Sequence, residues 1–395
     1  MVRYKMVGRD VNSSPTQYRQ WIVNDTPDLD GYYYTGLKSG PEPFVDISTY
    51  KIPDGYVMDF NLPLPLEWDL TFRALPEAVS NSQLAILDGY VYLFGGEVTD
   101  VIYRASLDSP ADWIDTGATL PTILSGAQFV DPDDGYIYLI GGLADLAVDT
   151  IYRAPRSNPL DWTNMGSCLP RELHKSQLLL ADGYLYLFGG HDLNEATNVI
   201  FQASISDPLT WTDTGQTLPD KLYGSTLGVM DGYVVLLGGL FKEDSPTKNI
   251  YRALLTAPTL WGIGGYLPYE ICYSQFATIG SKGYLFTQGA FTGTQDYLTT
   301  ILRCNISAPF NWIDTLHNVP GDITQSQLAV IYDRLFLFGG NGISIIVTCK
   351  QNLKYHPAYQ PAVDYGDLAR TQFQAASTLD RFIVLGFPPW KTDYS

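Results

Sequence analysis

Residues 88–96 read Asp-Gly-Tyr-Val-Tyr-Leu-Phe-Gly-Gly, a turn followed by a short apolar strand and a glycine pair. Similar stretches return at intervals of 46 to 51 residues, and five of the seven end in Gly-Gly. The fifth ends in Gln288-Gly289 and the seventh in Gly386 alone. The seven stretches begin at Asp88, Asp134, Asp182, Asp231, Lys282, Asp333 and Asp380. A repeat of this length predicts an array of similar structural units.

The remainder of the unit repeats as well. A strand pattern, Ile-Tyr-Arg-Ala, begins at Ile102, Ile151 and Ile250. A proline three residues before a tryptophan follows the strand, and a pair such as Leu120-Pro121 closes the unit. The proline and tryptophan pairs are Pro110/Trp113, Pro159/Trp162, Pro208/Trp211, Pro258/Trp261 and Pro309/Trp312. Together these features predict four strands in each unit.

An apolar strand ending in Gly-Gly, then a tyrosine, then a tryptophan shortly before Leu-Pro resembles the Kelch repeat family. The resemblance covers about residues 54 to 387 and implies an all-β propeller, while it says almost nothing about activity. The ten residues from Tyr103 to Trp113 exceed the usual Kelch spacing and imply a longer connection between the outer two strands. The regularity also resembles Kelch-like propellers of bacteriophage structural proteins.

The two ends of the repeat predict how the ring closes. Residues 58–68 align without gaps on residues 103–113, so the N-terminal side supplies two outer strands. Thr371–Ser377 and Arg381–Gly386 are interpreted as two inner strands. We therefore expect residues 54–395 to form a seven-bladed propeller of four-stranded blades, closed by an N-terminal outer pair joining a C-terminal inner pair. Such closure leaves only short, protected edges.

Residues 1–53 lie outside the repeat. They are rich in polar and turn residues, and they carry the cluster Tyr32-Tyr33-Tyr34 with little periodicity. Two interpretations stay open: a flexible arm, or an arm that docks the propeller onto a protein partner in an assembly.

The chain is acidic, with 24 Lys and Arg against 42 Asp and Glu and a net charge of −18. Nucleic acids and anionic membranes are therefore poor partners, because both bind clustered positive charge. Residues 1–10 have charges without an apolar run behind them, and no stretch approaches the length of a membrane span. We expect no signal peptide and no membrane insertion, and a virion surface is one candidate location.

Function is expected on the propeller face that carries the loops between second and third strands, because variable loops on a rigid scaffold carry binding groups. The opposite face carries the near-constant Asp-Gly turns. The variable loops are residues 97–101, 143–150, 191–199, 240–249 and 290–300.

A glutamine recurs at the entry to the inner strands, usually after Ser or Thr. Blade symmetry predicts a polar ring around the channel, formed by Gln83, Gln128, Gln177, Gln275, Gln327 and Gln372. Such a ring can hold channel water and satisfy backbone groups. It can also form the base of a sugar or peptide binding site at the channel mouth. The candidate binding residues there are His174, Lys175, Tyr223, Tyr273, Gln325 and Arg370.

Catalytic patterns are weak. The four histidines lie in different repeats without metal-ligand spacing, and residues 131–134 and 191–195 lack the spacing of a calcium loop. Four arginines occupy equivalent positions on third strands, which is typical of scaffold residues: Arg104, Arg153, Arg252 and Arg303. We expect no catalytic residues, no bound metal and no cofactor.

Two functional hypotheses follow. The first is a non-enzymatic binding or assembly module, such as a decoration or host-attachment component of a phage virion, that binds a protein or glycan through its variable face. The alternative is a carbohydrate-active enzyme at the channel mouth, similar to a sialic acid epimerase, a lyase or an oxidase. That alternative requires Arg370, His174 and Tyr273 to converge in one pocket.

Overall fold

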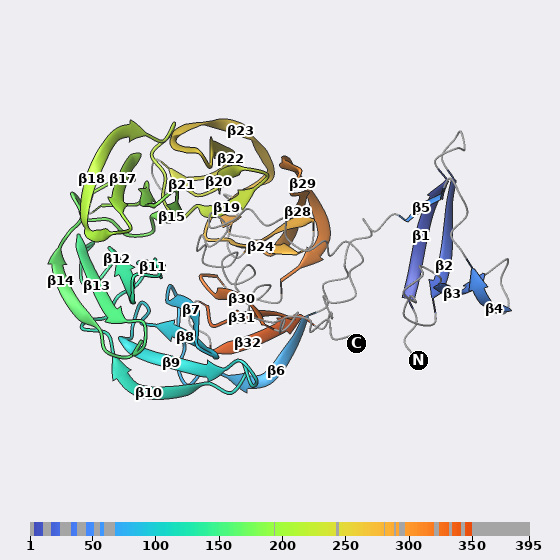
Figure 1. Cartoon of the computed structure of the whole chain (residues 1–395), viewed down its shortest axis with the longest axis horizontal. Helices are drawn as coiled ribbons and strands as arrows, with labels where there is room; N and C mark the ends of the chain where they lie inside the picture. Colours follow the sequence, from blue (N-terminus) through green and yellow to red (C-terminus); the bar gives the residue numbers. More distant parts are fainter. Residues whose placement is uncertain are drawn as a thin grey trace, which may run out of the picture. The chain divides into compact units, whose positions relative to one another are not determined.

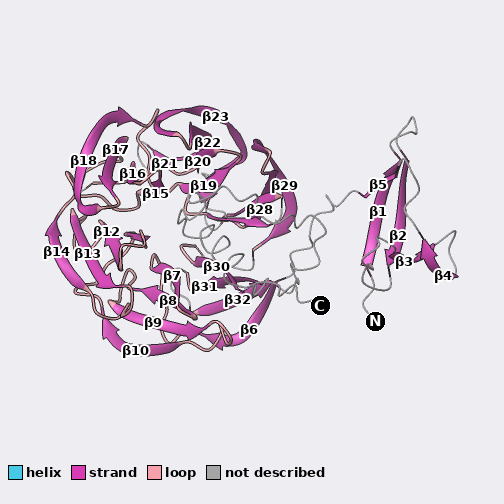
Figure 2. Ribbon diagram, viewed as in Figure 1, coloured by secondary structure: helices cyan, strands magenta, loops and turns pink. Residues whose placement is uncertain are grey.

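The structure is a computed structural model in which the chain divides into two units. One unit contains five short strands between residues 4 and 58, described through their backbone alone. The other is described over residues 68–349, without residues 193, 242–244, 280, 288–289, 292–296, 320–323, 332–333 and 341–343. Figure 2 shows that strands and their connecting loops make up this second unit.

The first unit is an antiparallel sheet with the order β4-β3-β2-β1-β5. Its strands are β1 (Tyr4–Asp10), β2 (Gln17–Val23), β3 (Tyr33–Leu37), β4 (Val45–Tyr50) and β5 (Tyr56–Met58). This sheet lies largely in the segment in which the sequence showed little periodicity. The docking role expected for residues 1–53 stays a prediction.

The second unit is a β-propeller whose four-stranded antiparallel blades surround a channel (Figure 1). In each of the first three blades the strands follow one another from the channel to the rim. Blade 1 contains β7 (Gln83–Leu87), β8 (Tyr90–Phe94), β9 (Val101–Ser106) and β10 (Ile114–Thr119). Blade 2 contains β11 (Gln128–Val130), β12 (Tyr136–Ile140), β13 (Thr150–Pro155) and β14 (Thr163–Ser167). Blade 3 contains β15 (Gln177–Ala181), β16 (Tyr184–Phe188), β17 (Val199–Ser204) and β18 (Asp207–Thr217).

Blades 4 and 5 add short strands in their variable loops. Blade 4 contains β19 (Thr226–Met230), β20 (Tyr233–Leu237), β22 (Ser245–Leu254) and β23 (Ala257–Ile271), with β21 (Leu240–Phe241) paired to β22. Blade 5 contains β24 (Gln275–Ile279), β25 (Lys282–Phe286), β28 (Thr300–Asn305) and β29 (Ala308–Asn318), with the hairpin of β26 (Ala290–Phe291) and β27 (Tyr297–Leu298). Blade 6 contains β30 (Gln327–Ile331), β31 (Arg334–Phe338), β32 (Ile345–Cys349) and β6 (Trp68–Ala74).

The prediction of seven blades was wrong: the described residues form six. The inner strand of blade 6, β30, contacts the inner strand of blade 1, β7, so the ring is already closed. The backbone N–H of Gly340 in blade 6 also donates to the carbonyl of Val79 at the entry to blade 1, at 2.9 Å. A seventh blade has no space between these neighbours.

The predicted two-plus-two closure was wrong as well, because the N-terminal side supplies only one strand of the closing blade. β6 pairs with β32, and Trp68 lies opposite Cys349. The Trp68 ring packs edge-on against Phe286 of blade 5, with centroids 5.9 Å apart, so it holds the position of a repeat tryptophan. The two predicted C-terminal inner strands, 371–377 and 381–386, lie outside the described residues.

Glycine pairs end the second strands because the next blade passes very close to them. The second glycine donates its N–H to a carbonyl of that blade, as Gly142 does to Leu173 at 2.8 Å. The first glycine has a positive φ, and a Cβ on Gly141 would lie 2.5 Å from the same carbonyl oxygen. Only glycine tolerates both the conformation and the close approach. The same donor contact joins Gly96 to Leu124, Gly190 to Leu222, Gly239 to Ile271 and Gly340 to Val79.

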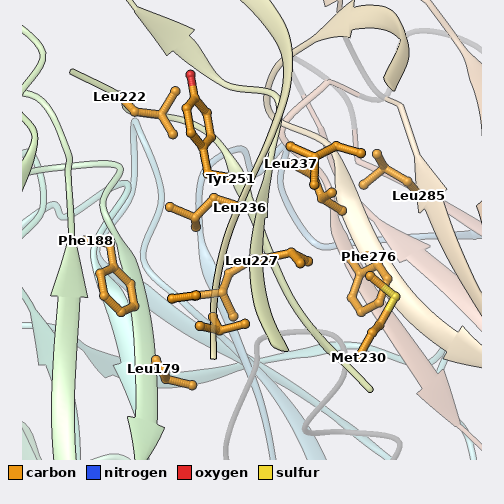
Figure 3. Packing of buried hydrophobic residues seen from close by; sticks show 14 of the residues in the cluster. Leu179, Phe188, Leu222, Leu227, Met230, Leu236, Leu237, Tyr251, Phe276 and Leu285 are labelled. Carbon is orange, nitrogen blue, oxygen red and sulfur yellow. The ribbon is translucent and has the colours of Figure 1, made fainter. Parts of the chain in front are cut away.

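The core consists of layers of apolar side chains between neighbouring blades. Successive residues of a strand point to opposite faces, so a second strand that is buried on both faces must be apolar throughout. In Figure 3, Leu236 of β20 lies on the side of Phe188 in blade 3, and Leu237 lies on the side of Leu285 in blade 5. The runs that follow each Asp-Gly turn therefore fill two interfaces at once.

The repeat tryptophans tie the rim of one blade to the core of the preceding blade. Each indole N–H donates to the carbonyl of the proline three residues earlier, at 2.7 to 3.0 Å, in all five pairs named above. The Trp162 ring then packs edge-on against Phe94 of blade 1, with centroids 5.1 Å apart. Trp113 packs in the same way on Phe338, which again joins blade 1 to blade 6. The spacing of proline and tryptophan thus fixes the position of the indole.

We predict that Trp162→Ala lowers the free energy of unfolding by about 3–5 kcal/mol, because it opens a cavity against Phe94. Ile114→Ala is the control: this side chain is exposed on an outer strand, and its loss changes stability by about 0.5 kcal/mol or less. Urea unfolding of the two variants gives the comparison. Equal losses would contradict a role for the indole in holding adjacent blades together.

Candidate functional site

Six residues at the channel mouth, one before each inner strand, share an unusual backbone conformation. All have positive φ angles between 51° and 64°. Five backbone hydrogen bonds of 2.8 to 3.2 Å link successive members from blade to blade. We call this ring the collar, and its members are Asn81, Gly126, Lys175, Gly224, Tyr273 and Gln325.

The two glycines of the collar leave room for large side chains from other blades. A Cβ on Gly126 would lie 3.0 Å from Cγ of Lys175, and a Cβ on Gly224 would lie 2.5 Å from the Tyr273 ring. Lys175 and Tyr273 therefore lie back over the glycine of the preceding blade. The alternation of small and large residues lets both side chains cover the mouth.

Lys175 and Tyr273 meet across the mouth. The Lys175 Nζ donates to the Tyr273 hydroxyl at 3.2 Å and lies 4.6 Å from the centre of the tyrosine ring. An ammonium group over a tyrosine face is an attractive cation–π arrangement. Lys175 is also the charged side chain among the described residues that line the channel cavity.

Below the collar lies a cavity of about 90 Å³, lined by the predicted glutamines Gln83, Gln128, Gln177, Gln275 and Gln327. Gln372, the sixth predicted member, lies outside the described residues. In blade 4, Thr226 takes the equivalent position and donates its hydroxyl to the carbonyl of Ser274 at 2.7 Å. The ring therefore contains five glutamines and one threonine across the six described blades.

The glutamine side chains also serve the scaffold. Gln83 and Gln128 each donate a side-chain N–H to the carbonyl of the preceding residue, at 3.1 and 3.0 Å. Gln177 accepts from the backbone N–H of Leu227 in the next blade at 3.2 Å. Whether the ring also binds a ligand stays a prediction.

Two predicted residues, His174 and Tyr223, belong to a second cluster beside the collar. The His191 ring lies between them, with centroids 5.4 Å from His174 and 4.9 Å from Tyr223. Tyr223 packs further with Ala196, Leu240 and Cys272, and Tyr273 of the collar borders this apolar group. The expectation that the four histidines lie in different repeats was wrong for His174 and His191, which both belong to blade 3. The sequence placed His191 in a variable loop but gave no signal that its ring would join this cluster.

Short contacts with neighbouring strands hold the His191 loop. His191 and His174 pair through their backbones, with N···O distances of 2.9 and 3.0 Å. The Asp192 carboxylate accepts the backbone N–H of Asn194 at 2.7 Å, and Lys221 forms an ion pair with Glu195 at 2.5 Å. Such a loop presents its side chains in a fixed arrangement.

The arginines of the third strands do not point toward a shared centre. The Arg104 guanidinium lies 4.7 Å from the centre of the Tyr90 ring, and Arg153 lies 4.1 Å from that of Tyr136. Arg252 lies between Tyr233 and Phe310, at 5.3 and 5.0 Å. These tyrosines open the second strands at the Asp-Gly turns, on the side opposite the collar.

Of the six predicted mouth residues, Lys175, Tyr273 and Gln325 line the cavity. His174 and Tyr223 lie in the neighbouring cluster, and Arg370 lies outside the described residues. Within the described ranges, no three His, Cys, Asp or Glu residues come together as metal ligands, and no helix is long and apolar enough to cross a membrane. The four cysteines are free thiols.

His174 provides a test of the cluster through pH. Burial, with the nearby charges of Lys175 and His191, lowers the pKa of His174 to about 4. The unfolded chain, in which a histidine titrates near pH 6.5, therefore binds a proton first as the pH falls. The stabilising contribution of neutral His174 is complete above about pH 6.5 and is lost between about pH 6.5 and 4.

We predict that His174→Phe, which keeps a ring against His191, makes the protein less sensitive to acid. The free energy of unfolding should fall by about 2 kcal/mol less between pH 7 and pH 4.5 than in the natural chain. Urea unfolding at the two pH values measures this difference. Parallel losses in both proteins would show that His174 titrates normally.

Comparisons with known proteins support the fold and give no family. No protein-family model matches the chain, and no curated protein matches it in sequence. Among solved structures 633 chains match. One of them, the structure of YjhT, superposes with a TM-score of 0.58 at 13% identity, over 70% of this chain and 94% of that chain. A likeness at this identity shows that the chain has a β-propeller fold.

Proposed function

We propose that the chain is a non-enzymatic binding and assembly propeller that engages a protein or glycan at the collar and the surrounding variable loops. One observation carries the proposal: Lys175 and Tyr273 adopt a left-handed conformation at positions where two other blades have glycine. A scaffold alone favours glycine there, because a side chain in this conformation is strained. Strain that persists at a concave surface is a reason to look for function.

The loops around the collar support the same proposal. Exposed apolar side chains lie on this face in four different connections: Val98, Ile123, Leu146 and Phe241. A partner that covers these apolar side chains removes them from water, which favours binding. The rings of Tyr273 and His191, which are partly exposed, give flat surfaces against which the C–H face of a sugar or an apolar side chain can pack.

The finer version of the proposal is a virion component that decorates a particle or attaches it to a host. It rests on the resemblance of the repeats to Kelch-like propellers of bacteriophage structural proteins. In this version residues 1–53 dock the propeller onto the particle, and the collar face points toward the host.

A carbohydrate-active enzyme at the same mouth is the second candidate. The Lys175–Tyr273 pair above a polar cavity favours it, since an ammonium and a phenol are groups that can hold or transfer a proton. Arg370, which this hypothesis also requires, lies outside the described residues. Product analysis of any glycan that binds separates the two candidates: binding without turnover supports the first.

We predict that Tyr273→Gly abolishes binding at the collar while the propeller keeps or gains stability. The substitution gives blade 5 the glycine that blades 2 and 4 already have, so the backbone strain is relieved. A glycan array, with thermal unfolding in parallel, measures both effects. The matched control is Tyr90→Ala, which removes an exposed tyrosine on the opposite face and should leave binding intact. Unchanged binding by Tyr273→Gly would exclude the collar.

Deletion of residues 1–53 tests the assembly role. We expect the truncated chain to retain the unfolding transition of the propeller and to be absent from the particle in which the full chain is found. Electron microscopy of the native material, with sedimentation of the full and truncated chains, provides the measurement. Incorporation of the truncated chain would show that the segment does not dock the propeller.

A further inference from the structure

The outer strand of blade 4 departs from the pattern of the other blades. In blades 1, 2, 3 and 5 the tryptophan and the Leu or Val of the closing pair are seven positions apart, whereas Trp261 and Leu267 are six positions apart. The missing residue belongs to a bulge. In blades 1, 2, 3 and 5 an Asp or Asn side chain accepts the N–H of a left-handed residue in this bulge, as Asp213 does from Gly215 at 2.8 Å. In blade 4 Ile263 takes the place of that acidic or amide residue.

The change makes the rim of blade 4 long and apolar. β23 runs for 15 residues, while β10 and β14 contain six and five. Leu260, Ile263 and Tyr266 on β23 are 64%, 49% and 61% exposed. The bulge persists in β23, between Ile263 and Gly265, but it is one residue shorter than in the other outer strands. Natural sheets blunt their edges with charges, and a long apolar edge with only Glu270 as a charged residue invites contact with another chain.

The neighbouring outer strand continues the apolar surface. On β29, Ile313 is 52% exposed and Leu316 is 88% exposed. Leu316 has a φ of 61° at the bulge position where blades 1, 2 and 3 have glycine, so a strained backbone holds its side chain in solvent. The Tyr269 hydroxyl donates to the Asp314 carboxylate at 2.9 Å and joins the two strands. The rim band is defined by Leu260, Ile263, Tyr266, Ile313 and Leu316.

A groove of about 500 Å³ adjoins the band at the boundary of blades 3 and 4. Leu254, Leu260 and Trp261 contribute its apolar lining, and Gln216 and Thr217 of β18 border it. Trp261 is partly exposed here, whereas the other four repeat tryptophans are buried. The band therefore combines protruding side chains with a recess that an apolar side chain can enter.

Charge indicates which partner fits. The chain has a net charge of −18, yet β23 and β29 together contain only Glu270, Asp314 and His317 as ionisable residues other than tyrosine. Asp314 already accepts hydrogen bonds from Tyr269, Thr300 and the backbone of Leu316. A second copy of the chain has the same acidic charge. The two copies therefore repel each other least where their surfaces carry few charges, as β23 and β29 do.

We propose that two copies of the chain associate through their rim bands about a two-fold axis. A two-fold interface needs one surface that is complementary to itself, and the band supplies both protrusion and recess. Leu316 and Tyr266 of one copy would enter the groove of the other, and reciprocally. The inference does not rest on the proposed function, because the rim and the collar are different surfaces.

Sedimentation velocity of the full chain at increasing concentration tests the proposal. We expect a species of twice the 43.9 kDa chain mass, and a dimer fraction that rises as salt increases from about 0.05 to 0.5 M, because salt screens the repulsion between two acidic copies. A chain that remains monomeric at its highest soluble concentration in both salts would overturn the proposal.

Matched variants locate the interface. Ile263→Asp should weaken dimerisation about tenfold or more, because it places a charge in the apolar band of each copy. Leu316→Gly should weaken it also, and it restores the glycine of the other bulges, so folding is not at risk. Ile114→Asp is the control: Ile114 is the counterpart of Ile313 in blade 1, with the same 52% exposure, but it lies outside the band. A dimer that survives Ile263→Asp and Leu316→Gly, or that Ile114→Asp weakens equally, would overturn the assignment.

Discussion

The contact on which the propeller depends is the approach of a blade to the glycine pair that ends the second strand of the blade before it. The second glycine donates its N–H to a carbonyl of the next entry loop, at 2.7 to 3.1 Å in five places. The first glycine is so close to that carbonyl that any Cβ would collide with it. This contact sets the distance between blades and, with the tryptophan that packs onto the preceding blade, the rotation from one blade to the next. The ring closes after six blades, where β30 contacts β7.

The collar is a consequence of the same geometry. A chain that has passed over the glycine pair must reverse direction to enter the inner strand, and the left-handed residue makes this turn. Four of the six collar residues are not glycine, although glycine is the residue best suited to the conformation. Lys175 and Tyr273 in particular are brought together from blades 3 and 5. The fold accounts for the left-handed backbone of the collar. It does not account for the presence of Lys175 and Tyr273 there, and we attribute these side chains to function.

Departures from the repeat are therefore the informative positions. Thr226 replaces the glutamine of the other five blades. Ile263 replaces the aspartate or asparagine of blades 1, 2, 3 and 5, and Leu316 replaces the glycine of blades 1, 2 and 3. The first changes the channel ring, and the other two add exposed apolar side chains to the rim of blades 4 and 5. Equivalent residues in different blades can therefore serve as controls for one another. Ile114 and Ile313, for example, follow the repeat tryptophans of blades 1 and 5 and are equally exposed, but only Ile313 lies in the rim band.

The sequence alone determined the β-propeller fold, the four strands of each blade and the residues that begin each inner strand, because turns, apolar runs and tryptophans act over short distances along the chain. The sequence did not determine the number of blades. The count of Asp-Gly-type turns predicted seven blades. The actual number depends on the angle between neighbouring blades, and contacts between residues far apart in the sequence, such as Gly340 with Val79, set this angle.

The candidate site was also predicted only in part. The position in the repeat predicted that Lys175, Tyr273 and Gln325 lie at the channel mouth. Only the tertiary structure showed that the Lys175 ammonium lies over the Tyr273 ring and that the His191 ring lies between His174 and Tyr223. Side chains from different blades come into contact only when the ring has closed, so the sequence gives no signal for these contacts.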